Sequence, residues 1–244
     1  MVVEHVAAVP VVRALLFDVF GTVVDWRSSL IADLEGWGRA RGIDADWTAL
    51  VDAWRQAYKP AMDEVRTHPE RPFAMLDTLH RRSLERLVAE QGIAGLTDAD
   101  LHHLTMGWHR LHPWPDSVPG LTRLKARYVI GPLSNGNVAL LTNMAKHGGL
   151  PWDLVLSAEL FAHYKPDPEV YLGAARLLGL PPQEVMMVAA HNYDLAAAQR
   201  GGLRTAFVAR PTEYGPGQTS DLVPTADWDV IGADFLDLAR QLET

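Results

Sequence analysis

Several residue types and patterns are missing from this sequence of 244 residues. It contains no cysteine, which excludes disulfide bonds and thiolate chemistry. No apolar run approaches the ~20 residues that span a bilayer, and the N-terminal segment lacks the basic start and apolar stretch of a signal peptide. There is no basic run, and the net charge of −8 argues against a nucleic-acid partner. We therefore expect a cytoplasmic protein that binds neither membranes nor nucleic acid.

The composition that is present is that of an ordinary globular protein, with 48% apolar and 21% charged residues. At this length the chain can hold one large domain or a core with an inserted module. Four short apolar runs have the character of buried parallel strands, and they occupy residues 11–17, 127–133, 184–190 and 204–209. The last three each follow a helical pattern. The sequence therefore predicts an α/β fold with a doubly wound, Rossmann-like parallel sheet.

Two of the helical patterns carry clear start and stop signals. One helix is predicted to begin at Asp167 as its capping residue, with Pro168 in the first turn and a glycine at its end. Another, over residues 194–203, stops at a pair of glycines. Residues 212–229 contain no such pattern and are predicted to form a long surface loop.

Residues 26–116 interrupt the alternation of strands and helices. Six of the eight tryptophans fall there. They are expected to build the core of a small helical module, and some of them can also wall a ligand pocket beneath it. Helical patterns without a convincing strand between them occupy residues 28–40, 49–65 and 76–92. We therefore predict an α/β core of residues 10–25 and 117–244, with a helical cap of residues 26–116 inserted after the first strand.

Polar residues follow the predicted strands at the edge of the sheet where ligands bind in open α/β folds. Each has an ordinary structural explanation as well: Asp194 can cap a helix, Ser134 and Asn135 can form a turn, and Lys165 can be a solvated surface charge. Their convergence from distant segments favours a common site. The residues concerned are Asp18, Ser134, Asn135, Lys165, Tyr171, His191 and Asp194.

Four motifs in order resemble the haloacid dehalogenase superfamily, and more closely its type II 2-haloacid dehalogenase branch. They are DVFGTVVD from Asp18, LSNGN around Ser134, KPDPEVY from Lys165 and AAHNYD ending at Asp194. Within the predicted cap, AWRQAY places Arg55 where these dehalogenases keep an arginine. The resemblance covers nearly the whole chain and implies the fold predicted above.

Two positions separate the dehalogenases from the phosphatases that make up most of this superfamily. The phosphatases carry a general-acid aspartate where this chain has Phe20, and an acidic magnesium ligand where it has Ala190. Magnesium prefers an octahedron of oxygen ligands, which alanine cannot supply. The resemblance therefore implies displacement of a halide, a leaving group that needs no proton, without metal or cofactor. A magnesium-dependent phosphatase for small esters and a non-catalytic carboxylate-binding protein remain the alternatives.

The resemblance also implies roles for residues that handle the substrate. Asp18 would attack the carbon that bears the halogen and form an aspartyl ester, beside the cation of Lys165. Ser134, together with backbone N–H groups of the strand-end turns, would bind the carboxylate of a short 2-haloacid. Arg55 and Asn135 would receive the departing halide.

For the hydrolysis of the ester, Asp194 is the candidate that activates or places the water, and it should be ionised beside Lys165. Tyr171 is either a hydrogen-bonding residue at the edge of the site or a packed core residue.

Two departures from the better-known dehalogenases lie in the last motif, where His191 replaces an asparagine and Ala189 replaces a serine. His191 is either a packed, hydrogen-bonded residue or part of the halide or water pocket. The motifs resemble a subgroup that includes enzymes acting on haloacetates, some of which cleave carbon–fluorine bonds, so fluoroacetate is a hypothetical substrate. Relatives often dimerise, and a homodimer is a further expectation.

Overall fold

A six-stranded sheet forms the centre of the molecule. The computed structural model describes residues 11–242, and within this range every neighbouring pair of strands in the order β5-β4-β1-β6-β7-β8 is parallel. The strands are β1 (Ala14–Phe17), β4 (Val129–Ser134), β5 (Leu156–Ser157), β6 (Val185–Ala189), β7 (Arg204–Val208) and β8 (Val230–Gly232). The ends of the predicted core at residues 10 and 243–244, and most of the N-terminal segment, lie outside the described residues.

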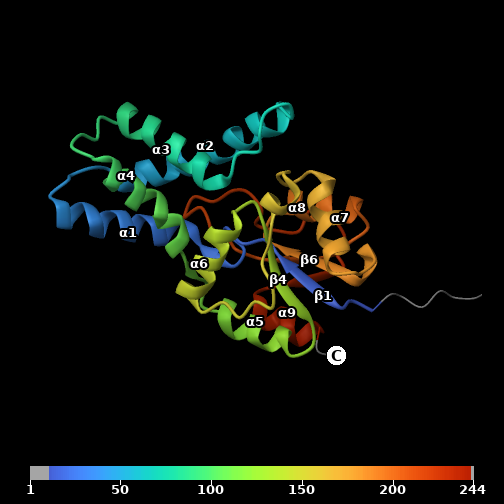
Figure 1. Ribbon diagram of the computed structural model, residues 1–244. Coiled ribbons are helices and arrows are strands. Elements are labelled where there is room, and N and C mark those ends of the chain that lie inside the picture. The colour runs from blue at the N-terminus through green and yellow to red at the C-terminus, as the bar shows by residue number, and fades with distance from the viewer. Residues whose placement is uncertain (1–10, 243–244) are drawn as a thin grey trace, which may run out of the picture.

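Helices cover both faces of this sheet, so the predicted doubly wound α/β fold is confirmed. α5 (Ser117–Lys125) and α9 (Phe235–Leu242) pack against each other on one face, whereas α7 (Pro168–Leu177) and α8 (Asn192–Arg200) cover the other (Figure 1). α6 (Val138–Gly148) packs against a 3₁₀ turn at Met106–Arg110. Because both faces are covered, β1 and β6 are buried along their whole length.

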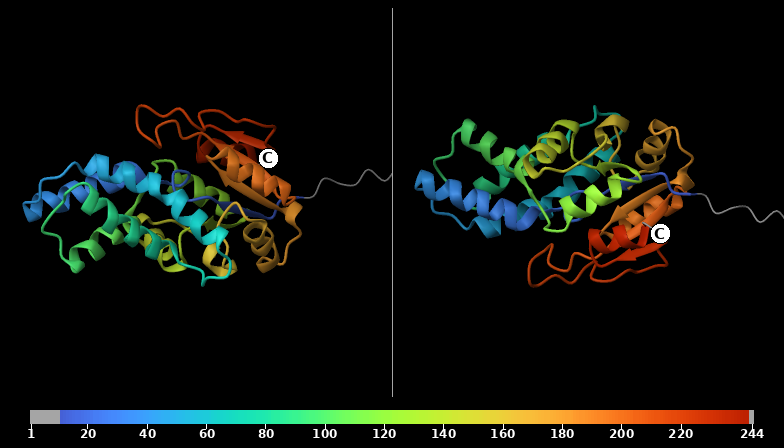
Figure 2. Two further views of the ribbon diagram at one scale, coloured as in Figure 1. Left: turned by 90° about the horizontal axis from the view of Figure 1, so that it is seen from above. Right: turned by 90° about the horizontal axis from the view of Figure 1, so that it is seen from below.

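The segment between β1 and α5 is mainly helical and stands at one end of an elongated molecule (Figure 2). Its helices are α1 (Trp26–Arg41), α2 (Trp47–Thr67), α3 (Leu76–Glu90) and α4 (Asp98–Thr105). We call residues 26–116 the cap and the rest the core, although the division at these residues stays a prediction. Trp26, Trp54 and Trp108 are fully buried in the cap. These large side chains therefore build the interior of this small module, and Trp26 also lines a cavity, so both interpretations hold.

Short strands were missing from the sequence-based prediction. β2 (Val24–Asp25) and β3 (His112–Pro113) form an antiparallel pair that ties the two ends of the cap together. β5 and β8 at the edges of the main sheet were also not predicted. These strands are two or three residues long, and a segment of that length shows no periodicity in sequence.

The predicted start of α7 and the predicted glycine stop of α8 hold, whereas α8 begins two residues earlier than predicted, at Asn192. α7 begins at Pro168, and α8 ends immediately before Gly201. Asp167 occupies the N-cap position of α7, but its side chain forms no capping hydrogen bond. Its carboxylate instead accepts a hydrogen bond of 2.6 Å from Arg66 of α2. This acid therefore joins the core to the cap.

Residues 212–229 form no helix or strand, as predicted. The expectation that this segment lies on the surface is wrong for Glu213 and Trp228, which are only 1% and 7% exposed. The loop therefore folds back over the core and contributes a buried carboxylate to it.

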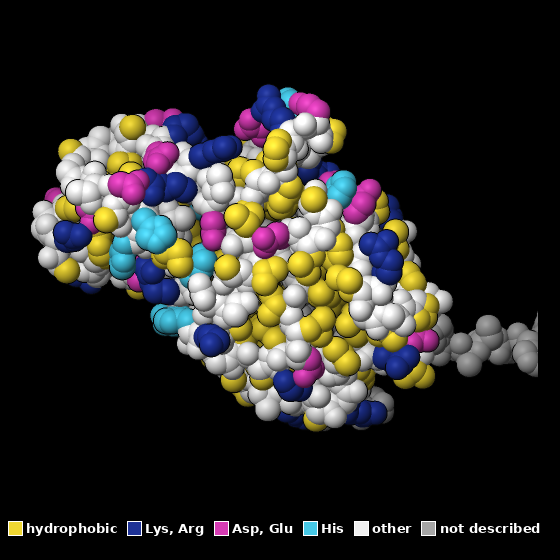
Figure 3. All heavy atoms as spheres, viewed as in Figure 1, with side chains coloured by type: hydrophobic (Ala, Val, Ile, Leu, Met, Phe, Trp, Pro, Cys, Tyr) yellow, Lys and Arg dark blue, Asp and Glu magenta, His cyan; other side chains and the backbone are white. Residues whose placement is uncertain are grey.

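Part of the outer surface of the core is apolar. Hydrophobic side chains gather on the face of the core that carries α7, where Leu160, Leu172 and Leu177 are exposed (Figure 3).

The expected homodimer stays a prediction. Among the described helices, none combines the length and the apolarity that a bilayer crossing requires.

Two glycines of α1 allow a matched test of how the cap is packed. A Cβ atom at Gly38 would lie 2.6 Å from the Trp47 ring, whereas at Gly36 the nearest heavy atom would be 4.0 Å away. We expect Gly38→Ala to lower the free energy of unfolding by about 1–3 kcal/mol through overpacking. Gly36→Ala should raise it by about 0.5–1 kcal/mol because alanine loses less backbone entropy in a helix. Urea unfolding of both variants checks this, and a Gly38→Ala protein as stable as the wild type would contradict the α1–α2 packing.

Candidate active site

Three charged side chains from different segments meet beyond the carboxyl end of the sheet. Asp18 follows β1, Lys165 precedes α7, and Asp194 lies in the first turn of α8. The Nζ atom of Lys165 donates to Asp194 Oδ2 at 2.7 Å and to Asp18 Oδ1 at 3.4 Å. All three residues are buried. The sequence prediction that these residues converge is therefore matched by the structure.

The second oxygen of Asp18 has its own set of donors. Asp18 Oδ2 accepts a hydrogen bond of 2.9 Å from Thr22 Oγ1 and lies 3.0 Å from His191 Nδ1. The Thr22 oxygen in turn accepts the backbone N–H of Ala190 at 2.9 Å. Burial alone would raise the pKa of Asp18, but Lys165, His191 and Thr22 outweigh it and hold that pKa well below its ordinary value. Asp18 is therefore an ionised carboxylate whose orientation is fixed.

His191 lies between two carboxylates, and the second belongs to a residue that sequence reasoning missed. Its Nε2 atom is 2.9 Å from Glu213 Oε2, and Glu213 Oε1 accepts a hydrogen bond of 3.0 Å from Trp26 Nε1. Burial would lower the pKa of His191, but Glu213 and Asp18 outweigh it and raise that pKa well above 6.5. Burial would likewise raise the pKa of Glu213, but His191 and Arg55 lower it. His191 is thus an imidazolium, and both of its N–H groups are already engaged.

Asp194 is held on its other side by Tyr171, whose hydroxyl donates to Asp194 Oδ1 at 2.5 Å. Tyr171 is fully buried, so it is both a packed residue and a hydrogen-bond donor. The N-cap of α8 is His191, and the Asp194 side chain forms no capping bond. Burial raises the pKa of Asp194 above its ordinary value, against the opposing effect of Lys165.

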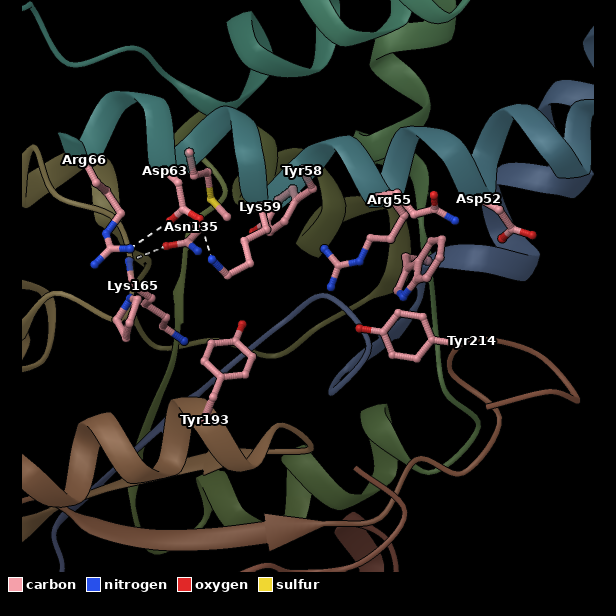
Figure 4. A pocket seen from close by; sticks show the side chains of 14 residues that line it. Asp52, Arg55, Tyr58, Lys59, Asp63, Arg66, Asn135, Lys165, Tyr193 and Tyr214 are labelled. Atoms are coloured by element: carbon pink, nitrogen blue, oxygen red, sulfur yellow. Dashed lines mark hydrogen bonds and ion pairs between the residues drawn. The ribbon is translucent and has the colours of Figure 1, made fainter. Parts of the chain in front are cut away.

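A cavity of about 730 Å³ lies between α2 of the cap and the core. Arg55, Tyr58 and Lys59 reach down into it from α2, and Tyr193 and Tyr214 reach into it from the core (Figure 4). Lys165 and Asn135 also line it. The tyrosines were not singled out in the sequence, because nothing in their local pattern distinguishes a pocket wall from packing.

Arg55 is a cation of this cavity whose guanidinium keeps a buried, unused donor. Its Nη1 atom is buried and has no hydrogen-bond partner among the described residues. Its guanidinium carbon lies 4.5 Å from the Tyr58 ring centroid and 5.3 Å from that of Trp26. Its Nη2 atom is 3.8 Å from Glu213 Oε1. Aromatic faces and one carboxylate thus hold the cation in place without saturating it.

The remaining predicted residues lie beside this constellation. The Ser134 side chain is fully buried, and its Oγ accepts the backbone N–H of Gly136 at 3.2 Å. Asn135 Oδ1 accepts the backbone N–H of Lys165 at 2.8 Å, and the Asn135 side chain also hydrogen-bonds the Tyr58 hydroxyl, so one of its two amide N–H donors remains. Phe20 is buried and meets the ring of Trp108 edge-on at 5.7 Å. The site therefore has no proton donor at the position of Phe20.

Comparison with known proteins shows which family this chain belongs to. A model of the haloacid dehalogenase-like hydrolase family matches residues 12–202. The chain belongs to this family. The (S)-2-haloacid dehalogenase 4A of Burkholderia cepacia is 29% identical over 218 residues, which cover 83% of this chain and 86% of that enzyme. The resemblance found in the sequence motifs is therefore confirmed.

Solved structures of family members are similar over almost the whole chain. The L-2-haloacid dehalogenase PA0810 is 59% identical with a TM-score of 0.92, and the match covers 95% of this chain and 99% of that one. The defluorinating L-2-haloacid dehalogenase Rha0230 is 49% identical with a TM-score of 0.93, over 96% of each chain. The cap and core described above are thus shared, in fold, with enzymes named as haloacid dehalogenases.

The two buried histidines near the site should behave oppositely in a ¹⁵N NMR titration. His191 should remain doubly protonated between about pH 5 and 8, because Glu213 and Asp18 raise its pKa. His80 should remain neutral, because burial lowers its pKa to about 3. A His191 signal that titrates near pH 6.5, the ordinary pKa, would contradict the contacts of His191 with both Asp18 and Glu213.

The raised pKa of His191 also fixes the sign of its effect on stability. A group with a raised folded-state pKa stabilises the protein fully below its unfolded pKa, and this contribution is lost as the pH rises through the folded value. The free energy of unfolding of the wild type, compared with that of His191→Asn, should therefore begin to fall as the pH rises past 6.5, the ordinary value, and should go on falling up to the raised folded-state pKa.

Proposed function

We propose that this protein hydrolyses short 2-haloalkanoic acids, including haloacetates, through a covalent ester on Asp18 and without a metal or cofactor. The observation that carries the proposal is a buried, ionised Asp18 that faces Lys165 while no proton donor stands at Phe20. A nucleophile in such a site suits a leaving group that departs as a stable anion. Halide is such a group, and the family and its dehalogenase members support this choice.

In the first step Asp18 forms a C–O bond to the carbon that bears the halogen, and the C–X bond breaks with both electrons leaving on the halide. The substrate carboxylate repels Asp18 by about 4 kcal/mol at 4 Å and an effective dielectric of 20, which is roughly a thousandfold in rate. Lys165, whose Nζ is 3.4 Å from Asp18 Oδ1, offsets this repulsion. Ser134 is the proposed ligand of the substrate carboxylate, because its hydroxyl accepts from Gly136 and its own O–H remains to donate.

The halide site proposed here combines Arg55 with Asn135. Arg55 supplies a buried N–H that no described residue accepts, and the amide nitrogen of Asn135 supplies a second donor. Donors already aimed at the position where charge develops need no reorganisation during the reaction. A halide leaving group would complete the hydrogen bonding of the guanidinium.

In the second step water attacks Cγ of Asp18 and regenerates the carboxylate. Asp194 is the proposed acceptor of the water proton, within a network that includes Lys165 and Tyr171. Its raised pKa makes it a better base than an ordinary aspartate.

Fluoroacetate belongs to the proposed substrates, because the defluorinating Rha0230 is 49% identical over nearly the whole chain. The cavity of about 730 Å³ also has room for chains longer than an acetate, so we expect (S)-2-chloropropionate to be accepted.

A magnesium-dependent phosphatase is the alternative function. The positions that would supply its acid and its metal ligand are Phe20 and Ala190, which offer neither. The Ala190 backbone N–H is committed to Thr22. The residues present therefore do not fit a magnesium site of that kind.

The function is tested by halide release from chloroacetate, bromoacetate, fluoroacetate and (S)-2-chloropropionate, each with EDTA and with added magnesium. We expect release that EDTA leaves unchanged, and its near-complete loss in Asp18→Asn while the fold is retained. Phosphate release from a generic ester that requires magnesium, with no halide from any haloacid, would support the phosphatase instead. Fluoride at background while chloroacetate turns over would remove fluoroacetate alone.

A matched pair in α2 tests the halide site. Arg55→Met should lower kcat by about 10²–10³-fold, as the loss of one positioned donor does elsewhere. Lys59→Met is the control, since Lys59 lines the same cavity but pairs with Asp63, is largely exposed and should change the rate only slightly. Equal effects of the two substitutions would show that Arg55 acts only through the general charge of the cavity.

A further inference from the structure

The two oxygens of Asp18 lie in different surroundings. Oδ1 faces Lys165, which lines the cavity, and the contact of 3.4 Å is long. Oδ2 is held at 2.9 Å by Thr22 and at 3.0 Å by His191. Because Oδ1 has the weaker hold and its partner Lys165 lines the cavity, Oδ1 is the oxygen that would attack. Oδ2 then becomes the carbonyl oxygen of the ester.

We propose that the Thr22 hydroxyl and the His191 Nδ1–H form an oxyanion hole for hydrolysis of the Asp18 ester, and that Glu213 is the positioning residue that holds His191. The inference rests on the proposed dehalogenase function and adds the residues that act in its second step. His191 therefore has a task other than halide binding, for which neither of its N–H groups is free.

The direction of both hydrogen bonds is fixed by what lies behind each donor. The Thr22 oxygen accepts the Ala190 N–H, so its own O–H points at Asp18 Oδ2. His191 has a carboxylate at each ring nitrogen, so both nitrogens carry a proton and donate. Neither group can turn away without leaving a buried partner unsatisfied. The donors are therefore in place before the reaction begins.

Hydrolysis through this arrangement is balanced. The water oxygen bonds to Cγ, the carbonyl electron pair moves onto Oδ2, and the water proton passes to the Asp194 network. Collapse of this tetrahedral intermediate breaks the Cγ–Oδ1 bond and releases the 2-hydroxyacid, whose alkoxide oxygen takes back that proton. The second water proton then leaves the Asp18 carboxyl group for the solvent, which restores the carboxylate. The negative charge appears on Oδ2 only during this passage, so donors aimed at it favour the transition state over the ester.

Glu213 keeps the His191 imidazole protonated after Asp18 has lost its negative charge. Ester formation neutralises Asp18, and Glu213 at 2.9 Å is then the carboxylate that still contacts His191. The Glu213 carboxylate can lie this close to His191 only because residue 21 is a glycine. At Gly21 φ is +87°, and a Cβ atom there would lie 2.1 Å from Glu213 Oε1. Trp26 fixes the other carboxylate oxygen. The buried position of Glu213 thus follows from several contacts, which is expected of a residue that orients another.

The first test is rapid-mixing kinetics of His191→Ala with chloroacetate. We expect a burst of one halide per site to survive, while steady-state turnover falls by about 10²–10³-fold. The carboxymethyl ester on Asp18 should accumulate and be visible by mass spectrometry of the intact protein. Loss of the burst itself, or a turnover equal to that of the wild type, would overturn the proposal.

The second test is the pH dependence of hydrolysis in Glu213→Gln. The groups that face His191 are Asp18, Glu213 and the Tyr193 ring, with Arg55 beyond Glu213 and Lys165 beyond Asp18. Without the Glu213 charge the imidazolium loses its proton more easily, so ester hydrolysis should fall as the pH rises and recover as it is lowered.

In the wild type and in Asp227→Asn, the rate of ester hydrolysis should not fall in this way as the pH rises. Asp227→Asn is the control because Asp227 is an exposed acid of the same loop. A Glu213→Gln profile parallel to that of the wild type would overturn the proposal, and this test decides even if His191→Ala does not fold. Absence of halide release from every haloacid in the wild type would instead refute the proposed function. The two failures are therefore distinguishable.

Discussion

The buried contact of the Lys165 ammonium with the carboxylates of Asp18 and Asp194 is the interaction on which the site depends. Each ion removed from water costs several kcal/mol unless a partner of opposite sign replaces the solvent. Lys165 can balance only one of its two acids, and His191 balances the other. Glu213 and Arg55 add a further acid and a further cation. The result is a continuous series of alternating charges. In order it comprises Asp194, Lys165, Asp18, His191, Glu213 and Arg55.

This series links the cap to the core. Arg55 belongs to α2 of the cap, and Glu213 to a loop that follows the last long strand of the core. Glu213 reaches the series only because Gly21 leaves space for its carboxylate. The turn after β1 therefore has two tasks, since it ends the strand that presents Asp18 and it admits the acid that holds His191. An error in either part would leave a buried charge without its partner.

The sequence predicted those parts of the site that the sheet itself arranges. Asp18, Lys165 and Asp194 follow apolar runs or lie between them, and the parallel order of strands brings such residues to one edge. Glu213 was missed because its neighbours are the Gly, Pro and polar residues of a surface loop. Its burial results from contacts with Trp26 and His191 that are distant in sequence. Likewise β5 and β8 are too short to show a period, and their pairing is set by the strands beside them.

The alternating series also accounts for the order of events in the proposed reaction. Its three acids and three cations balance, so a bound haloacid adds one negative charge in excess. Displacement neutralises Asp18 but creates a halide, and the excess persists beside Arg55. It disappears when the halide leaves, at which point Lys165 and His191 flank an uncharged ester linkage, and the substrate carboxylate takes the place of the Asp18 charge in the balance. The field of these two cations is then free to polarise the ester carbonyl and attract the water. Departure of the halide thus prepares the site electrostatically for hydrolysis.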